Sequence, residues 1–507
     1  MRRLNVAVFL MSVLLPGAAF AQFGREWTTS GNDAQRSNWL RTDGKISPTT
    51  LQKAGFAHLW KMKFNNAARQ LNALTQAMIM DRLIGYRGFR ALVFLSGSSD
   101  QVIVADSDLA RPEWQVTLPG GSSQAGTATC PGALTSGVTR PTTLSIAPPP
   151  STGGATGFGG RGGPAKSGVG APGEGAVTLA ARAAARPAPP APARPARMTA
   201  RPPGGFGAPS VIYALSSNGM LHELNTQNGT AVHPATRFLP GNANAHGLIM
   251  VDDLFYVATD GTCNGVADGV WMLDIGSKKV TNWKSPKGVA GNVGPALGPD
   301  GTVYVATRGG ELVSLTGETL AAKGTYNAGQ PFSSSPVVFE HKGKLMVAAT
   351  TADGRLHVAD AASMSAIAKS DADAKAANYS VGALASWQDP SGTRWILVPT
   401  STGVNAWKLT DSGLQSGWTS RELVSAMTPV VMNGVVFAVS SGFKGNVKNS
   451  QPAVLYALDG VSGKELWSSG STIASFATTG GLTGGASQLY LSTYDGTLYA
   501  FGIPIEH

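Results

Sequence analysis

The stretch AVLYALDGVSGKELW, residues 453–467, carries the pattern that decides the fold. An alternating strand ends at Asp459, a glycine-containing turn follows, and a second strand brings Trp467. The stretch QVIVADSDLARPEW repeats the pattern, with the same eight-residue offset between Asp106 and Trp114, and GVWMLDIGSKKVTNW repeats it with an offset of nine. A strand–turn–strand unit that recurs along a chain predicts a repeat architecture.

Pairs of hydrophobic strands, such as GTVYVATRGGELVSL and SQLYLSTYDGTLYAF, define eight units. The first strands of these pairs begin near Leu92, Val211, Leu254, Thr302, Leu345, Trp395, Val435 and Leu489. After the long gap between the first two, the spacing is about 40 to 54 residues. Four short antiparallel strands per unit at this period predict an all-β fold, a single eight-bladed β-propeller of four-stranded blades.

The last unit ends at 499–501 without an outer strand, whereas FAHLWKMKF (56–64) is an outer-type strand without preceding partners. We therefore expect this N-terminal strand to complete the last blade, which removes exposed sheet edges. Five tryptophans would then occupy equivalent outer-strand positions and pack between blades. They are Trp60, Trp114, Trp283, Trp418 and Trp467.

A low-complexity insertion, 148–209, interrupts the repeat. Within 151–210, glycine, proline and alanine together outnumber all other residue types, a composition typical of disorder. Seven cations against Glu174 alone place +6 of the formal charge of +10 there. Because two more cations, Arg2 and Arg3, lie at the N-terminus, the predicted propeller keeps only +2, which argues against a nucleic-acid partner. A solvated tether and a basic arm touching anionic surfaces both remain open.

The segment 1–21 predicts a cleaved signal peptide: a basic pair, an apolar stretch, and Ala19-Phe20-Ala21 before Gln22. No cysteine lies near this cleavage site, so we expect no lipid anchor. No later segment has 18 uninterrupted apolar residues, so we expect a periplasmic or secreted product with no transmembrane segment. The predicted parts are the signal peptide (1–21), an N-terminal segment (22–55), the propeller (56–147 and 210–507) and the insertion (148–209).

Cys130 and Cys263 are the two cysteines, and both lie in glycine-rich loops. An oxidising compartment favours a disulfide between them, with two free buried thiols as the alternative. Asp260 and Asp268 flank Cys263 and could offer oxygen ligands to calcium. Asp-Gly pairs are ordinary in turns, however, and we expect no metal.

The AxDxxxGKxxW signature of the seventh unit resembles the repeat of pyrroloquinoline quinone (PQQ) proteins. The segment WTTSGNDAQRSNW, residues 27–39, is similar to the opening segment of quinoprotein propellers. The family contains dehydrogenases and also non-enzymatic propellers, among them the scaffold subunit of the outer-membrane β-barrel assembly machine. The alcohol dehydrogenases hold PQQ above a disulfide of adjacent cysteines, with calcium bound by acidic and amide side chains. Cys130 and Cys263 are far apart in sequence and no calcium motif matches, so no catalytic residue is carried over.

In a propeller, the loops that lead into the innermost strands surround one mouth of the channel, where ligands usually bind. The residues expected there offer hydroxyls and amides rather than a clustered acid and base. They are His246, Asn292, Ser334, Tyr379, Thr428 and Thr478. Capping of strand ends and binding of a neutral polar ligand or peptide are the two interpretations.

We expect a monomeric, non-catalytic scaffold without a cofactor, which binds an envelope or secreted protein partner or a ligand. The alternative is a PQQ- and calcium-dependent dehydrogenase that oxidises an alcohol or sugar at a diverged site.

Overall fold

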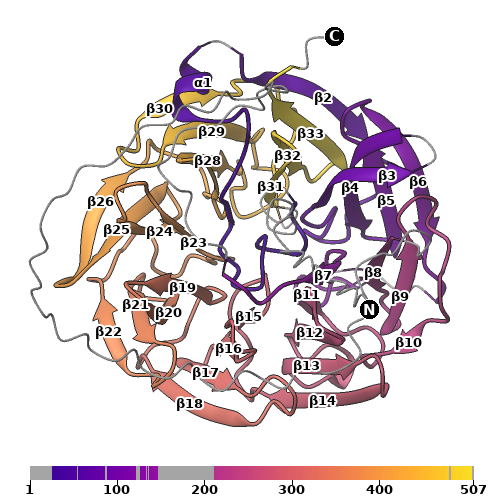
Figure 1. Ribbon diagram of the computed structural model, residues 1–507, viewed down its shortest axis with the longest axis horizontal. Coiled ribbons are helices and arrows are strands. Elements are labelled where there is room, and N and C mark those ends of the chain that lie inside the picture. Colours follow the sequence, from indigo (N-terminus) through magenta and orange to yellow (C-terminus); the bar gives the residue numbers. More distant parts are fainter. Residues whose placement is uncertain are drawn as a thin grey trace, which may run out of the picture.

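The computed structural model describes residues 26–504 except 54, 86–87, 121–125, 133, 135, 147–209 and 479–480. The predicted signal peptide (1–21) and the insertion (148–209) lie outside the described residues. The described strands form eight sheets, arranged as the blades of a ring around a central channel (Figure 1). This confirms the predicted all-β, eight-bladed propeller.

The first four blades follow the order of the chain. Blade 1 contains β3 (Met78–Gly85), β4 (Gly88–Gly97), β5 (Gln101–Asp106) and β6 (Arg111–Thr117). Blade 2 contains β8 (Val211–Leu215), β9 (Met220–Asn225) and β10 (Thr236–Arg237). Blade 3 contains β11 (Ala245–Val251), β12 (Leu254–Thr259), β13 (Gly269–Asp274) and β14 (Lys279–Lys284), with β7 (Pro141–Thr142) beside β11. Blade 4 contains β15 (Ala296–Leu297), β16 (Val303–Ala306), β17 (Glu311–Leu315) and β18 (Ala322–Asn327).

The other four blades complete the ring. Blade 5 contains β19 (Val337–His341), β20 (Lys344–Thr350), β21 (Leu356–Asp360) and β22 (Ala366–Lys369). Blade 6 contains β23 (Ala385–Gln388), β24 (Arg394–Pro399), β25 (Val404–Thr410) and β26 (Gly413–Thr419). Blade 7 contains β27 (Val430–Met432), β28 (Val435–Ser440), β29 (Val454–Asp459) and β30 (Glu465–Ser468), with β1 (Trp39–Leu40) beside β27. Blade 8 contains β31 (Leu482–Gly485), β32 (Gln488–Ser492), β33 (Thr497–Gly502) and β2 (Ala57–Lys63). The one α-helix of the described residues, α1 (Pro48–Gln52), precedes β2.

The second strand of each blade explains the hydrophobic runs in the sequence. Every residue of β12 and of β28 is buried, because both faces of these strands pack against neighbouring blades. The outermost strands β2 and β22 contain only partly buried and exposed residues. The core is therefore distributed between blades rather than gathered in one place.

Blade 8 is closed by the N-terminal strand. β2 pairs antiparallel with β33, and Trp60 lies opposite Ala500. The predicted completion of the last blade by this strand is confirmed. Blade 2 is irregular: Thr139 takes the innermost position through a bridge to Tyr213 of β8. The insertion thus departs between the first and second strands of this blade.

Outer-strand tryptophans reach the following blade. The indole Nε1 of Trp60, Trp114 and Trp418 donates to the carbonyl oxygens of Ser107, Thr226 and Gly460, at 2.9, 2.9 and 3.0 Å. Each acceptor lies in the turn before the outer strand of the next blade. Trp283 packs against the core between blades 3 and 4, and Trp467 packs edge-on against Phe56 and Phe501.

The glycine of the repeat signature makes room for the preceding blade's tryptophan. Gly463 has a φ of +72°, and a Cβ there would lie 2.7 Å from the indole of Trp418. Gly229 has the same φ and stands in the same relation to Trp114. Both the backbone conformation and the close contact require glycine at these turns.

Residues 26–40, named the inner belt here, run around the inside of the ring; Figure 1 shows this indigo segment crossing the centre. The belt contacts the innermost strands of six blades in order. Its hydrogen bonds join Trp27 to Ile79, Thr29 to Leu248, Ala34 to Leu297, Gln35 to Val338, Ser37 to Ser386 and Asn38 to Val431.

Candidate ligand-binding mouth

A cavity of about 420 Å³ lies at the mouth where the chain leads into the innermost strands. Residues 72–76, 379–382 and 425–428, which precede β3, β23 and β27, form parts of its wall. Ser30 and Asn38 of the inner belt also line it. The cavity therefore lies beside the inner belt, and its volume falls within the range of about 300–1,000 Å³ that is typical of small-molecule sites.

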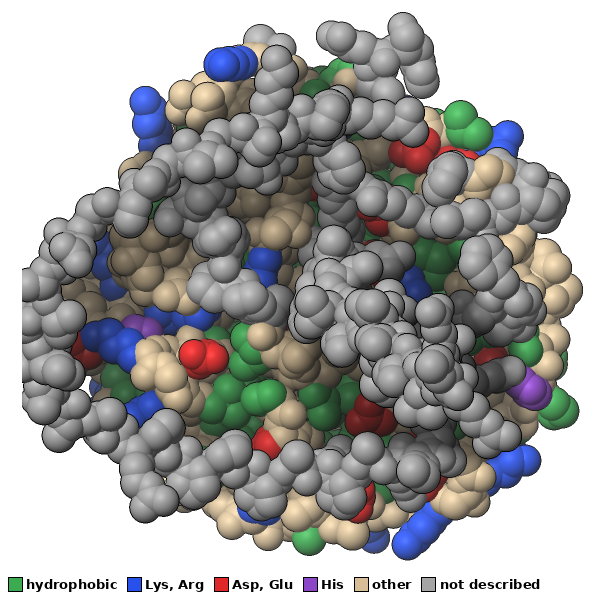
Figure 2. Space-filling view, viewed as in Figure 1, with side chains coloured by type: hydrophobic (Ala, Val, Ile, Leu, Met, Phe, Trp, Pro, Cys, Tyr) green, Lys and Arg blue, Asp and Glu red, His purple; other side chains and the backbone are tan. Residues whose placement is uncertain are grey.

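The wall of this cavity is electrically neutral. Its described lining residues are serine, threonine, asparagine, glutamine, glycine and alanine, together with Val293, Tyr379, Met427, Phe443 and Leu482. No Asp, Glu, Lys, Arg or His is among these described residues. On the face shown in Figure 2, described charged side chains lie along the edge and also farther inward, but none of them belongs to the described lining of this cavity. The mouth can therefore form hydrogen bonds but offers a ligand no counter-charge.

Four of the six predicted mouth residues line the cavity: Asn292, Tyr379, Thr428 and Thr478. The other two positions need correcting. Ser334 is fully buried, and its hydroxyl accepts a hydrogen bond from the Thr350 amide at 2.9 Å. His246 is not among the lining residues, and burial lowers its imidazole pKa, opposed by the carboxylate of Asp260.

Three lining side chains brace neighbouring blades. The Tyr379 hydroxyl donates to the Ala426 carbonyl at 2.7 Å, and burial raises the pKa of this phenol. The Thr428 hydroxyl both donates to and accepts from the backbone of Ala383, and Thr478 donates to the Leu71 carbonyl. For these three residues the structure shows the capping role.

Other polar groups at the cavity have hydrogen-bonding capacity that no described residue uses. The side chains of Asn292 and Ser380 are exposed, and neither forms a hydrogen bond with another described residue. Asn38 is 1% exposed; its Nδ2 donates to the Leu384 carbonyl at 2.9 Å, but its Oδ1 is buried with no partner among the described residues. Such a buried acceptor is costly unless a water or ligand donates to it.

Arg36 fixes the inner belt beneath the cavity, and the sequence analysis missed it. This fully buried side chain donates from Nε to the Pro295 carbonyl at 2.9 Å and from Nη2 to the Gly247 carbonyl at 2.7 Å. Its Nη1 donates to the Thr29 hydroxyl and the Ser30 carbonyl. Burial lowers the pKa of the guanidinium to about 9. The signal in the sequence was an arginine inside a non-alternating, Asn-rich stretch between two tryptophans.

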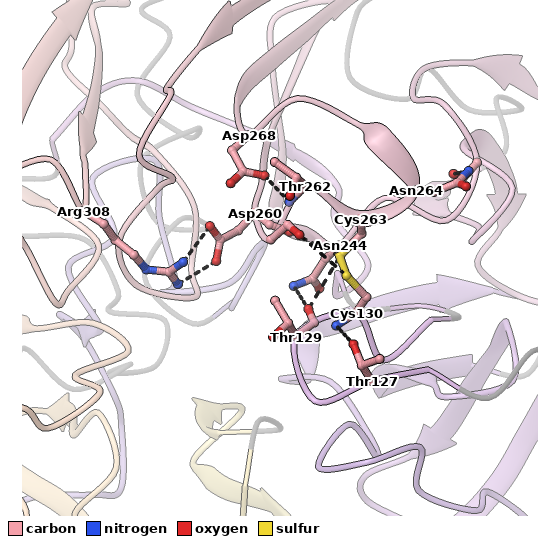
Figure 3. Close-up of a disulfide and its surroundings, with 12 residues drawn as sticks. Thr127, Thr129, Cys130, Asn244, Asp260, Thr262, Cys263, Asn264, Asp268 and Arg308 are labelled. Atoms are coloured by element: carbon pink, nitrogen blue, oxygen red, sulfur yellow. Dashed lines mark hydrogen bonds and ion pairs between the residues drawn. A yellow bond between two sulfur atoms is a disulfide. The ribbon is translucent and has the colours of Figure 1, made fainter.

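A disulfide links the loops of blades 2 and 3 near the mouth (Figure 3). Cys130, in the loop before Thr139, and Cys263, in the β12–β13 loop, form a disulfide with an S–S distance of 2.01 Å. Asp260 pairs with both Arg308 terminal nitrogens at 2.8 and 2.6 Å, and Asp268 accepts from the Thr262 amide. The carboxylates of Asp260 and Asp268, the two possible calcium ligands, thus form contacts within the protein. Among the described residues, no group of three or more His, Cys, Asp or Glu could hold a metal.

A serine–histidine pair in blade 2 resembles a catalytic dyad, since the Ser216 hydroxyl lies 2.9 Å from His222 Nε2. Blade 5 repeats the arrangement with Thr351 and His357 at 3.1 Å. Both pairs occupy the same turn of the repeat, SSNGMLH and TADGRLH, and both are buried. The recurrence assigns the pair to turn stabilisation.

PQQ and calcium, which the sequence resemblance implies, do not fit this mouth. PQQ is a tricarboxylate and needs cationic or metal partners, whereas the described lining contains neither cations nor carboxylates. The disulfide joins cysteines 133 residues apart, so no pair of adjacent cysteines forms a platform.

No family model and no curated protein matches this sequence. Among solved structures, quinohemoprotein alcohol dehydrogenase from Comamonas testosteroni matches with a TM-score of 0.61 at 12% identity, covering 96% of this chain and 82% of its own. A europium-containing methanol dehydrogenase matches with a TM-score of 0.59 at 11% identity, covering 95% and 99%. BamB from Moraxella catarrhalis gives a TM-score of 0.49 at 14% identity, covering 90% and 99%.

The described residues contain no helix long and apolar enough to cross a membrane. At identities of 11–12%, the likeness to the two dehydrogenases shows the fold alone. The chain therefore has the eight-bladed architecture of the quinoprotein-type propellers.

Proposed function

We propose that this protein is a non-catalytic binding propeller whose mouth takes up a neutral, polar ligand. The neutral lining of the cavity carries this proposal. A charged ligand would lose its hydration there without gaining an opposite charge. A neutral ligand with hydroxyl or amide groups would exchange its water hydrogen bonds for those of the wall.

The setting we propose is the periplasm or the extracellular space. The signal-like segment 1–21 supports it, and so does the disulfide, which persists in oxidising compartments. In this setting the ligand group could belong to an envelope or secreted protein, and the basic insertion would touch an anionic surface.

The mouth is tested by blocking it. Ser380 lines the cavity and is exposed, so Ser380→Trp narrows the opening without removing an internal hydrogen bond. Ser277 is exposed in the β13–β14 turn, and Ser277→Trp serves as the matched control. In thermal-shift titrations with uncharged and charged small molecules, we expect uncharged ligands to stabilise the wild type and the control, but not Ser380→Trp.

The competing function is a PQQ-dependent dehydrogenase, which the fold of the two similar enzymes favours. Titration of the purified protein with PQQ and calcium, followed by cofactor absorbance and alcohol- or sugar-dependent dye reduction, separates the two. Saturable PQQ binding with turnover would overturn the binding-propeller proposal. Absence of both, with uncharged ligands bound at the mouth, supports it.

A further inference from the structure

We propose that the ligand of the mouth is the terminal unit of a neutral saccharide; this inference rests on the proposed function and specifies its ligand class. Three features of the cavity support this ligand class. They are polar groups with unused hydrogen-bonding capacity, an aromatic ring in the wall, and the inner belt inside the ring.

The polar groups with unused capacity call for a ligand that donates and accepts on several sides. Asn38 lines the cavity, and its Oδ1 is a buried acceptor without a described partner, so an O–H or N–H of a ligand that reaches it would remove an unsatisfied group. Asn292 adds an amide from the blade 4 side and Ser380 a hydroxyl from the blade 6 side. Sugar hydroxyls each donate and accept, and they point outward around the ring in several directions.

The wall also offers an aromatic surface. Phe443, from the β28–β29 loop, lines the cavity, and its ring stacks with Phe476 at a centroid distance of 5.9 Å. Phe476 stacks in turn with Tyr494 at 4.6 Å, which supports the ring from behind. The C–H face of a pyranose is apolar while its rim is polar, and this combination matches an aromatic ring beside amides and hydroxyls.

The inner belt favours a compact group over a chain that passes through the ring. Asn38 and Ser30 belong to a segment that lies inside the ring and hydrogen-bonds to the innermost strands of blade 1 and of blades 3 to 7. Because this segment takes up space inside the ring, the end of a ligand fits the cavity better than a chain that continues through the ring. A compact group can enter and leave by the same opening, as the end of a glycan does.

The test uses saturation-transfer NMR and calorimetry on the full chain. The probes are maltose, cellobiose and N,N′-diacetylchitobiose, with glucuronic acid as a charged saccharide and a capped Gly-Ser-Asn peptide as a neutral non-saccharide. We expect at least one neutral disaccharide to bind and the two other classes not to bind. Asn292→Ala and Ser380→Ala should each weaken that binding about fivefold, as loss of one hydrogen bond does. Ser277→Ala is the matched control.

Phe443 gives a second, sharper readout. Phe443→Leu keeps an apolar side chain but removes the ring, and we expect it to weaken saccharide binding about fivefold or more. Phe443→Tyr keeps the ring and should bind like the wild type. Equal binding by Phe443→Leu and wild type would overturn the stacking role and, with unchanged binding by Asn292→Ala, the inference itself.

The remaining outcomes separate the two proposals. Binding of the capped peptide that Ser380→Trp abolishes, without saccharide binding, overturns the saccharide inference and leaves the binding propeller standing. Binding of PQQ with turnover, and of no neutral probe, overturns both.

Discussion

Two belts tie the blades together, and they do so by different means. The outer belt consists of the five tryptophans Trp60, Trp114, Trp283, Trp418 and Trp467, which pack toward the next blade. The inner belt, residues 26–40, gives about one residue to each blade it passes, mainly through backbone hydrogen bonds. The outer contacts repeat with the blades, whereas the inner contacts are each made once. A contact that repeats in every blade can be predicted from a single sequence, because it produces a periodic pattern. A contact that is made once produces no such pattern.

The largest effect should come from breaking the inner belt at Arg36. Arg36→Ala leaves four oxygen acceptors, three in buried hydrogen bonds and one in a part-buried one, without their charged donor. At about 1–3 kcal/mol for each unsatisfied group, we expect the free energy of unfolding to fall by roughly 5 kcal/mol or more. Guanidinium unfolding followed by tryptophan fluorescence measures it.

Arg421→Ala is the control for this substitution. Arg421 forms an exposed ion pair with Glu465, and its side chain is 49% exposed. We expect a loss of at most about 1 kcal/mol. If the two variants lost equal free energy of unfolding, the inner belt would not be a main contributor to the stability of the ring.

The outer belt should respond next, at Trp418. Trp418→Ala empties a site that is 8% exposed, and we expect a loss of about 4 kcal/mol. Trp418→Phe also removes the hydrogen bond to Gly460, whereas Trp283→Phe removes no such bond between described residues. Thermal or denaturant unfolding should therefore show Trp418→Phe to be about 1 kcal/mol less stable than Trp283→Phe; the reverse order would contradict the role of the indole donor.

Removal of the disulfide should have an intermediate effect. The double substitution Cys130→Ala and Cys263→Ala opens a loop of 133 residues. We expect a loss of about 3 kcal/mol, mainly because the unfolded chain gains freedom. Unfolding of the wild type with and without reductant should reproduce this difference. If alkylation of the native protein labels both cysteines, the bond is not formed and the prediction fails.

The smallest effect should come from Tyr304, whose hydroxyl links blade 4 to blade 5. The outer strand of blade 4 has no tryptophan, and the Tyr304 hydroxyl donates instead to the Ala361 carbonyl at 3.0 Å. Tyr304→Phe should cost about 1 kcal/mol near neutral pH.

Tyr304 also predicts a pH dependence with a definite sign. Burial raises the pKa of its phenol above the ordinary value of 10.0, so the unfolded chain ionises first. Stability is therefore fully present below about pH 10 and falls as the pH rises above it. Tyr304→Phe should lose less stability than the wild type between about pH 10 and 11. An unchanged slope would show that this phenol does not contribute.

The sequence sufficed for the blades because their pattern repeats. Alternating strands, the Asp–Gly–Trp offsets and the unpartnered strand at 56–64 predicted the eight blades and their closure, both of which the structure confirms. The inner belt does not alternate, and it follows the ring through left-handed backbone at Asn32, Arg36 and Asn38. Such a path has no repeating sequence pattern from which it could be predicted.

The mouth was predictable only in part, for a geometric reason. Four of six residues chosen from the loops line the cavity, since those loops converge by the symmetry of a propeller. Which side chain of an extended segment faces the channel depends on a shift of one residue. Ser334 faces the core for this reason, and Asn38 reaches the cavity from a segment that no repeat predicted.

The position of the inner belt has a consequence for the order of folding. Residues 26–40 leave the ribosome before any blade exists, yet their partners extend to Val431, and β2 pairs with a strand that ends at Gly502. Residues 26–40 can form these hydrogen bonds only after the strands that follow them in the sequence have been made. Such long-range closure makes folding slow and prevents it from completing during synthesis. The ring therefore closes only after the strand that ends at Gly502 has been made.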